Sequence, residues 1–292
     1  MISKEVITAA LTGIAVTGVI PVIAGLVLLA MNKIKASSFW AGVLAFVIAI
    51  VAASVISGII SAAVVVSSMN DGTTDIMNAA MNENSTLISA LQILIGIVIA
   101  LAMAICVGKC MKTRTFNAAL SCGLGFGISY LVTAAMSFFS SYSTFSMINN
   151  GSFDSQYAPM VSQGLITKEA VNAQKEALTA MTVGDILFSI VLSAAVALLM
   201  TAAAVIIMRG VCAKKAFAGI GISLVLFAAQ FGTMGFVSNT AASAIVAAAI
   251  GAAALIFAVR MGKDIVPPEK PSYANDSFMK SIENAKSDTD GE

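Results

Sequence analysis

The sequence predicts an all-α, polytopic membrane protein with seven transmembrane helices. Of its 292 residues, 59% are hydrophobic and only 11% are charged, and the mean hydropathy is +0.95. Because water-soluble domains carry about 25% charged residues, this composition excludes an ordinary globular protein. Seven stretches are also apolar over the roughly 20 residues that a helix needs to cross a hydrocarbon core of about 30 Å.

The seven expected spans differ in length and in the irregularities that they contain. They are Ile7–Met31, Ser38–Ser67, Leu87–Val107, Phe116–Phe139, Val183–Met208, Ala216–Val237 and Thr240–Val259. Pro21 lies near the middle of the first span and predicts a kink, because proline removes a helical hydrogen bond. The second span has 30 residues and would be about 45 Å long as a helix, so we expect it to tilt or to project beyond the bilayer.

Lysine and arginine gather in alternate connections, and this distribution predicts the orientation of the chain. One set of connections and helix ends carries ten of them: Lys33, Lys35, Lys109, Lys112, Arg114, Arg209, Lys214, Lys215, Arg260 and Lys263. The opposite set carries three: Lys4, Lys168 and Lys175. Since basic loops stay in the cytoplasm, we expect an outside N-terminus and a cytoplasmic C-terminus in a bacterial plasma membrane.

The chain divides into a membrane domain over residues 1–263 and a tail over residues 264–292. A long connection at residues 140–182 predicts an extracellular cap of two short helices, Asp154–Gln163 and Thr167–Ala180, around a stop at Gly164. The tail has seven acidic residues against three lysines and few apolar ones, so we expect it to be disordered. The net charge of +1 gives no indication of a nucleic-acid partner.

Residues able to carry chemistry are scarce in the predicted spans. The chain has no histidine, which excludes histidine-based catalysis and histidine-ligated metals. No charged residue lies deep in a span. The nearest one is Asp185, near the start of the fifth span, and we interpret it as a helix N-terminal residue favoured by the helix dipole. The sequence therefore predicts no cofactor, no metal and no ordinary acid–base pair.

The remaining polar and small residues of the spans have structural interpretations. Weakly polar side chains are expected to bond their own backbone or a neighbouring helix; they are Ser54, Ser57, Ser61, Gln92, Tyr130, Thr133, Ser189, Ser193, Thr201, Ser223 and Gln230. The G-x-x-x-G pair Gly123 and Gly127 favours close helix packing over a flexible hinge.

Four cysteines lie towards the predicted cytoplasmic side: Cys106, Cys110, Cys122 and Cys212. Cys106 and Cys110 are expected on one helix face. A four-thiolate zinc site would normally use short C-x-x-C pairs, which are absent here. Reduced, unligated thiols are therefore the favoured interpretation.

The segment Thr115–Gly127, TFNAALSCGLGFG, resembles the YhfC family of glutamic-type intramembrane proteases. The segment Ala36–Ala45, ASSFWAGVLA, is similar to the start of the family's second helix, and GLIT at Gly164–Thr167 is similar to its outer loop. Matching features follow in order from Ile7 to Lys263, so the resemblance implies the family's seven-helix fold.

The resemblance also implies where catalytic groups would lie, and none of them is present. The family's glutamates, arginines and histidines correspond to Val98, Ile99, Ala102, Phe126, Tyr130, Gly184, Asp185, Leu192 and Ser223. A glutamic protease needs a carboxylate to activate water, so we expect a catalytically inactive protein that binds a membrane partner, a transmembrane peptide or a lipid. Two alternatives remain: a small-solute transporter or transporter subunit, and a membrane peptidase that uses atypical residues.

Overall fold

The computed structural model describes residues 1–70, 85–111, 114–163, 166–236, 239–262 and 265. Within these residues the chain is helical without a strand, and seven of its helical segments are long and apolar enough to cross a membrane. The predicted all-α, seven-span architecture is therefore confirmed. Apart from Ile265, the predicted tail lies outside the described residues.

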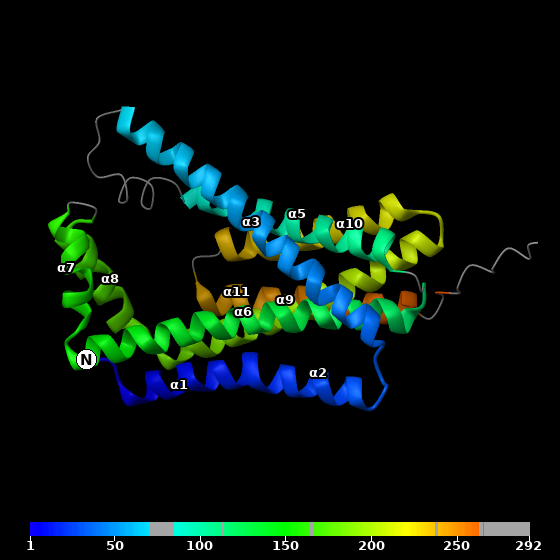
Figure 1. Cartoon of the computed structure of the whole chain (residues 1–292), viewed down its shortest axis with the longest axis horizontal. Helices are drawn as coiled ribbons and strands as arrows, with labels where there is room; N and C mark the ends of the chain where they lie inside the picture. The colour runs from blue at the N-terminus through cyan, green and yellow to red at the C-terminus, as the bar shows by residue number, and fades with distance from the viewer. Residues whose placement is uncertain (71–84, 112–113, 164–165, 237–238, 263–264, 266–292) are drawn as a thin grey trace, which may run out of the picture.

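The helical elements follow the predicted spans closely. In chain order they are α1 (Lys4–Ile14), η1 (Ala15–Val19), α2 (Ile20–Ala30), α3 (Ala36–Asn70), α5 (Ser85–Ile105), η2 (Cys106–Cys110), α6 (Phe116–Asn150), α7 (Phe153–Ser162), α8 (Lys168–Ala180), α9 (Val183–Cys212), α10 (Ala216–Phe236) and α11 (Thr240–Gly262). The first span consists of α1, η1 and α2, which follow one another in one direction (Figure 1).

The first span accommodates Pro21 through a local change of helix type. The π-helical turn η1 ends at Val19, and Pro21 lies in the first turn of α2. The backbone stays helical through η1 into α2, and the Ile20 N–H bonds to the Ala15 carbonyl five residues earlier, so the wider π-helical turn comes directly before the residue that lacks an N–H. The irregularity expected at Pro21 is therefore a π-helical turn next to the proline.

Helix α9 lies at the centre of the bundle. Its most apolar stretch is 72% buried, whereas the corresponding stretches of the other six spans are 17–44% buried. Every residue from Ala195 to Met208 except Leu198 is buried. The helix packs against α1, α6, α10 and α11, and α3 and α5 are attached mainly through α6 and α10. This arrangement makes α9 the helix around which the other spans of the bundle are arranged.

Glycines set the distance between α6 and its neighbours. A Cβ added at Gly123 would lie 2.7 Å from the Cα of Thr201 on α9, and one at Gly127 would lie 2.9 Å from the Ala197 carbonyl oxygen. Gly125 faces the other way, where an added Cβ would overlap the Phe39 carbonyl of α3. The predicted packing role of these glycines is confirmed, and it involves two helices.

Helix α6 is longer than the sequence indicated. It continues without a break from Phe116 to Asn150, so its 35 residues measure about 52 Å. The predicted boundary at residue 139 was wrong, because the run of serine, threonine and aromatic residues that follows is polar but keeps helical geometry. Gly151 adopts a left-handed conformation with φ of 79° and ends the helix there.

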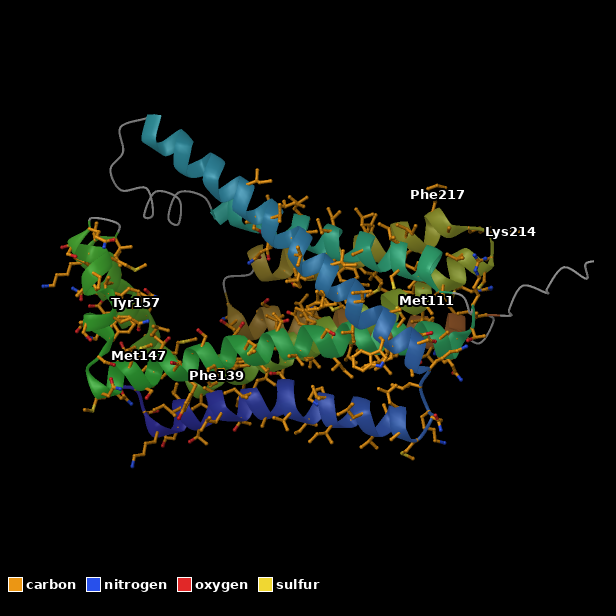
Figure 2. The ribbon with its side chains drawn as sticks, in the orientation of Figure 1. Met111, Phe139, Met147, Tyr157, Lys214 and Phe217 are labelled. Atoms are coloured by element: carbon orange, nitrogen blue, oxygen red, sulfur yellow. The ribbon has the colours of Figure 1, made fainter. Side chains whose placement is uncertain are left out.

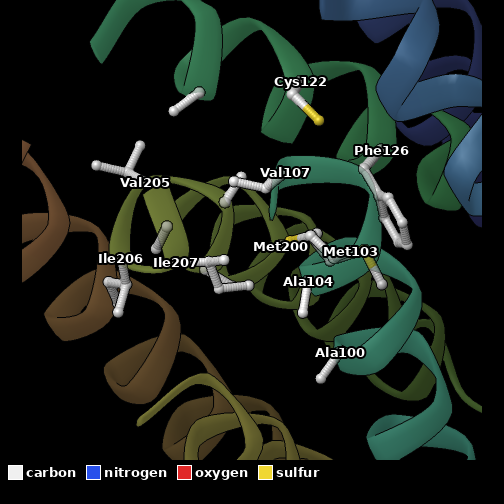
Figure 3. Close-up of a cluster of buried hydrophobic side chains, with 14 of the residues drawn as sticks. Ala100, Met103, Ala104, Val107, Cys122, Phe126, Met200, Val205, Ile206 and Ile207 are labelled. Atoms are coloured by element: carbon white, nitrogen blue, oxygen red, sulfur yellow. The ribbon is translucent and has the colours of Figure 1, made fainter. Parts of the chain in front are cut away.

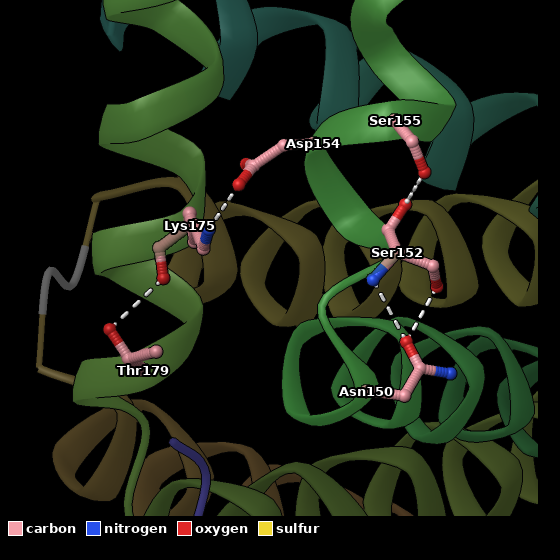
Figure 4. A network of polar contacts seen from close by, with 6 residues as sticks. All are labelled: Asn150, Ser152, Asp154, Ser155, Lys175 and Thr179. Carbon is pink, nitrogen blue, oxygen red and sulfur yellow. Dashed lines mark hydrogen bonds and ion pairs between the residues drawn. The ribbon is translucent and has the colours of Figure 1, made fainter.

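The two predicted cap helices are confirmed as α7 and α8, and they lie beside the N-terminus at one end of the bundle (Figure 1). Asp154 and Lys175 form an ion pair between them with a nitrogen–oxygen distance of 2.7 Å (Figure 4). Asn149 near the end of α6 exchanges two hydrogen bonds with the backbone of Ile2, at 2.7 and 3.0 Å. We call this end of the molecule the cap end.

The opposite end carries the basic connections, and we call it the basic end. Lys33 and Lys35 are exposed between α2 and α3, and Lys214 and Lys215 are exposed between α9 and α10. Phe217 beside them is 93% exposed and points away from the bundle (Figure 2). An exposed aromatic ring next to lysines is typical of the boundary between membrane and water.

Candidate functional site: a hydroxyl-lined cavity

The positions that the resemblance assigns to catalysis do not form one site. They are Val98, Ile99, Ala102, Phe126, Tyr130, Leu192 and Ser223. Val98 and Ala102 line an apolar groove between α3 and α5, whereas Tyr130 and Leu192 line a cavity between α1, α6 and α9. The other three are buried in packing contacts. Only the second location combines polar groups with space for a ligand.

The cavity between α1, α6 and α9 has a volume of about 320 Å³ and lies in the half of the bundle nearer the cap end. We call it the hydroxyl cavity. Its polar residues are Tyr130, Thr133, Ser137, Ser141, Ser189 and Ser193, and its apolar residues are Ala10, Ala134, Phe138, Phe145, Met181, Ile186 and Leu192. Thr133 and Ser137 are exposed, so the cavity reaches the molecular surface.

A four-residue repeat on α6 builds one wall of the hydroxyl cavity. Thr133, Ser137 and Ser141 are spaced by four positions and share one helix face. Each donates its hydroxyl proton to the backbone carbonyl four residues earlier, with oxygen–oxygen distances of 3.2, 3.4 and 3.1 Å. Such bonds satisfy a hydroxyl within its own helix. In this arrangement the hydroxyl proton is directed to its own helix.

Helix α9 builds the facing wall in the same way. Ser189 donates to the Asp185 carbonyl at 2.8 Å, and Ser193 donates to the Ser189 carbonyl at 2.9 Å. The expectation that hydroxyls in the spans bond their own backbone is confirmed at these positions and at Thr201 and Ser223. What the sequence did not reveal is that two such rows border one cavity.

Among the residues that the structure describes, no Asp, Glu, Lys or Arg lines the hydroxyl cavity. The nearest candidate of the sequence analysis, Asp185, caps α9. Its carboxylate accepts hydrogen bonds from the Thr182 backbone N–H at 2.9 Å and from the Thr182 hydroxyl at 2.8 Å, and the Thr182 hydroxyl accepts from the Asp185 N–H at 3.3 Å. This capping box supports the interpretation of Asp185 as a helix N-terminal residue.

Tyr130 closes the deeper side of the hydroxyl cavity and joins it to an aromatic cluster. Its ring lies edge to face with Phe46 of α3 at a centroid distance of 6.4 Å, and Phe46 lies edge to face with Phe126 at 5.2 Å. Phe126, which replaces the family's histidine by the resemblance, is fully buried. Apolar aromatic packing therefore occupies the place where the resemblance would put a catalytic base.

The apolar groove between α3 and α5 has a volume of about 340 Å³ and consists of alanine and branched side chains with one thiol. Leu44, Ile48 and Leu101 on its rim are exposed, as expected for surface that meets lipid. Val98 and Ala102 give this groove no group that could act as acid or base. These two positions, which the resemblance assigns to catalysis, are thus part of a hydrophobic surface.

Two of the cysteines lie much closer together than their sequence separation indicates. The Sγ atoms of Cys106 and Cys122 are 3.8 Å apart, and the Cys106 thiol also lies 3.4 Å from the Ala41 carbonyl oxygen. Cys122 belongs to a buried cluster with Met103 and Met200 (Figure 3). Cys106 begins the π-helical turn η2 and Cys110 ends it; the side chain of Cys110 lies outside the described residues, so the expected shared face of the two cysteines stays a prediction.

Among the described residues, no group of three or more His, Cys, Asp or Glu side chains is placed to hold a metal ion. Gln230 on α10 is fully buried, and neither its amide oxygen nor its amide nitrogen has a hydrogen-bond partner. The Gln92 amide oxygen on α5 has none either. These two amides do not line the hydroxyl cavity.

Comparison of the chain with protein-family models, with curated proteins and with solved structures finds no match.

Proposed function

We propose that this chain is a non-catalytic membrane protein with a YhfC-like fold, which binds a membrane partner, a transmembrane peptide or a lipid through the hydroxyl cavity. The observation that carries the proposal is the chemistry of the cavity. Hydroxyls from α6 and α9 surround about 320 Å³ of space, and no charged side chain lines it. Peptide hydrolysis needs a group that activates water, whereas binding needs only space and matching polar groups.

The position of charged residues supports an orientation for this function. The exposed lysines at the basic end favour a cytoplasmic location for that end. In that orientation the hydroxyl cavity would lie in the outer half of a bacterial plasma membrane. A ligand would therefore reach the cavity from the outer leaflet or from outside the cell. The cap helices α7 and α8 lie at the same end of the molecule.

A proteoliposome assay tests the proposal. Purified chain is mixed with a panel of labelled transmembrane peptides and with lipids, and both cleavage and binding are measured. We expect no cleavage and saturable binding of at least one probe. A Ser189→Leu substitution narrows the cavity and should weaken that binding about tenfold or more. Ala194→Leu adds comparable bulk at an exposed position of α9 outside the cavity and should leave binding unchanged.

Cleavage that exceeds the rate in protein-free liposomes and is lost on one substitution would contradict the non-catalytic assignment. Binding that is equal in the wild type and in Ser189→Leu would move the ligand to another surface. The first result therefore tests whether the chain is catalytic, and the second tests whether the ligand binds in the hydroxyl cavity.

A second candidate function, transport of a small solute, is favoured by one observation. Tyr130 lines the hydroxyl cavity, its ring contacts Phe46 of α3, and Phe46 in turn contacts Phe126. An aromatic cluster thus lies behind the cavity, towards the basic end. If it acts as a gate, a Phe46→Ala substitution should raise solute flux across vesicles. Unchanged flux in Phe46→Ala and no flux in the wild type would dismiss transport.

A further inference from the structure

The hydrogen bonds of the hydroxyl cavity determine which ligand chemistry it accepts. A serine or threonine hydroxyl has one proton to donate and two lone pairs that accept. At Thr133, Ser137 and Ser141 the proton is used within α6, and at Ser189 and Ser193 it is used within α9. The oxygen lone pairs are what remains to face the cavity from both walls.

Other donors in the cavity wall are nearly absent. Of the remaining lining residues, Tyr130 alone carries a side-chain hydrogen-bond donor, its phenol hydroxyl. The others are alanine, phenylalanine, methionine, isoleucine and leucine. An anionic ligand would therefore meet oxygen lone pairs with almost no donor to stabilise it. A ligand that brings several donors and no acceptor would find partners on two helices.

Depth and size restrict the ligand further. Ala10 and Ser189 lie six residues from the starts of α1 and α9, about 9 Å along each helix. On α6, Ser141 lies about 14 Å and Tyr130 about 30 Å from the end at Asn150, so the cavity extends from near the cap end towards the middle of the bundle. The cavity volume of 320 Å³ falls in the range of small-molecule sites and exceeds what a bare ion would fill.

We propose that the hydroxyl cavity binds a primary ammonium group, which donates its three N–H bonds to the oxygens of the two hydroxyl rows on α6 and α9. An ammonium has three donors and no acceptor, which complements the donor-poor wall. The group belongs either to the headgroup of an aminophospholipid or to a free amine, because both present the same chemistry. This inference rests on the proposed binding role of the hydroxyl cavity and names its ligand.

The experiment uses the full chain in nanodiscs of phosphatidylglycerol. Calorimetric titrations compare butylammonium, butan-1-ol and butyrate, which share a carbon chain and differ in the polar group. Native mass spectrometry then compares retention of phosphatidylethanolamine with that of phosphatidylcholine, whose trimethylated nitrogen has no N–H. We expect butylammonium to bind at least about tenfold more tightly than the other two probes, or phosphatidylethanolamine to be retained over phosphatidylcholine.

Matched variants locate the effect. The double substitution Ser137→Ala and Ser189→Ala removes one oxygen from each wall and should abolish the preference for ammonium. Ser189→Thr keeps the oxygen and should preserve it. Ser129→Ala removes an equivalent hydroxyl, bonded to the Gly125 carbonyl at 2.8 Å, from outside the cavity and should have no effect.

The soluble probes and the lipids distinguish the two possible sources of the ammonium group. A preference for butylammonium alone would identify a free amine, whereas a preference for phosphatidylethanolamine alone would identify a lipid headgroup. Either result supports the ammonium assignment. Equal binding of ammonium, alcohol and carboxylate, together with equal retention of both lipids, would overturn it. If a transmembrane peptide still bound under Ser189 control, the proposed function would stand without this ligand. Loss of binding for every probe and peptide would overturn both.

Discussion

The two halves of helix α6 meet the same neighbour in opposite ways. In the half nearer the basic end, Gly123 and Gly127 bring the backbone of α6 against Thr201 and Ala197 of α9. In the half nearer the cap end, hydroxyl rows from both helices line a cavity of about 320 Å³. Close packing of α6 against α9 therefore ends where the glycines end, because larger side chains at that point keep the two helices apart.

The two halves of α6 therefore have different roles: the glycine half packs against other helices, and the hydroxyl half lines the proposed binding site. The glycine half forms part of the larger of the two buried clusters among the described residues. The hydroxyl half places polar oxygens beside open space.

Substitution of Gly125 by leucine should damage the fold most. An added Cβ already overlaps the Phe39 carbonyl, and neither backbone can move without separating α3 from α6. Overpacking of this kind costs about 3 kcal/mol or more. We expect Gly125→Leu to lower the thermal unfolding temperature sharply in detergent. Gly221→Ala is the control, since nothing lies within 4 Å of its added Cβ, and it should be neutral or slightly stabilising.

A smaller loss of stability is expected at the cap of α9. Thr182→Ala removes the side chain that accepts from the Asp185 N–H, and loss of such a cap costs about 1 kcal/mol. Asp185→Asn keeps an acceptor oxygen and should lose less. Chemical unfolding of both variants measures the difference. A change in ligand binding or turnover at unchanged stability would instead assign Asp185 a functional role.

The hydroxyl half of α6 should tolerate substitution with little change in stability. Ser141→Ala removes a hydroxyl that bonds only its own helix, and alanine favours helix formation. The free energy of unfolding should therefore change by less than about 0.5 kcal/mol. Thermal unfolding beside Gly125→Leu provides the comparison. A loss similar to that of the glycine variant would mean that the cavity walls are packed and would remove the contrast between the two halves.

The smallest effect is expected in the cap. The Asp154–Lys175 pair is partly exposed, with side-chain exposures of 62% and 33%, and surface pairs contribute about 0.5 kcal/mol or less. We expect Lys175→Ala to leave the unfolding temperature nearly unchanged and to remove the part of its salt dependence that comes from this ion pair. Unfolding measured at low and high ionic strength tests this. A marked fall in the unfolding temperature at both ionic strengths would show that Lys175 also stabilises the cap through Phe153. The centroid of the Phe153 ring lies 5.8 Å from the Lys175 side-chain nitrogen.

Much of the fold was predictable because bilayer thickness and helix geometry fix the length of an apolar span. The seven spans, the two cap helices and the packing role of Gly123 and Gly127 followed from hydropathy, turn residues and spacing. The end of α6 did not, because the hydropathy of the chain falls after residue 139 while the helix continues to Asn150. Polarity ends a membrane span, but only a backbone signal such as Gly151 ends a helix.

The site was harder to predict than the fold. Tyr130, Thr133, Ser189 and Ser193 were identified as weakly polar residues, but Ser141 was placed outside the fourth span and so was not weighed with them. The repeat of hydroxyls every four residues was the available signal. Nothing in the sequence indicated that Cys106 lies close to Cys122. Contact between neighbouring helices depends on their relative rotation, and residue spacing along one helix does not determine that rotation.

The most direct test of the division within α6 is the reactivity of single cysteines towards a membrane-impermeant thiol reagent. Ser137→Cys faces the hydroxyl cavity, and Met136→Cys, one residue earlier, replaces a side chain that is 67% exposed and lies outside the cavity. Both are made in a chain whose native cysteines are alanine. Because a thiolate forms in water and not in lipid, the account predicts rapid modification at 137 and slow modification at 136. Equal, slow modification at both positions would contradict it, since the hydroxyl rows would then border no hydrated site.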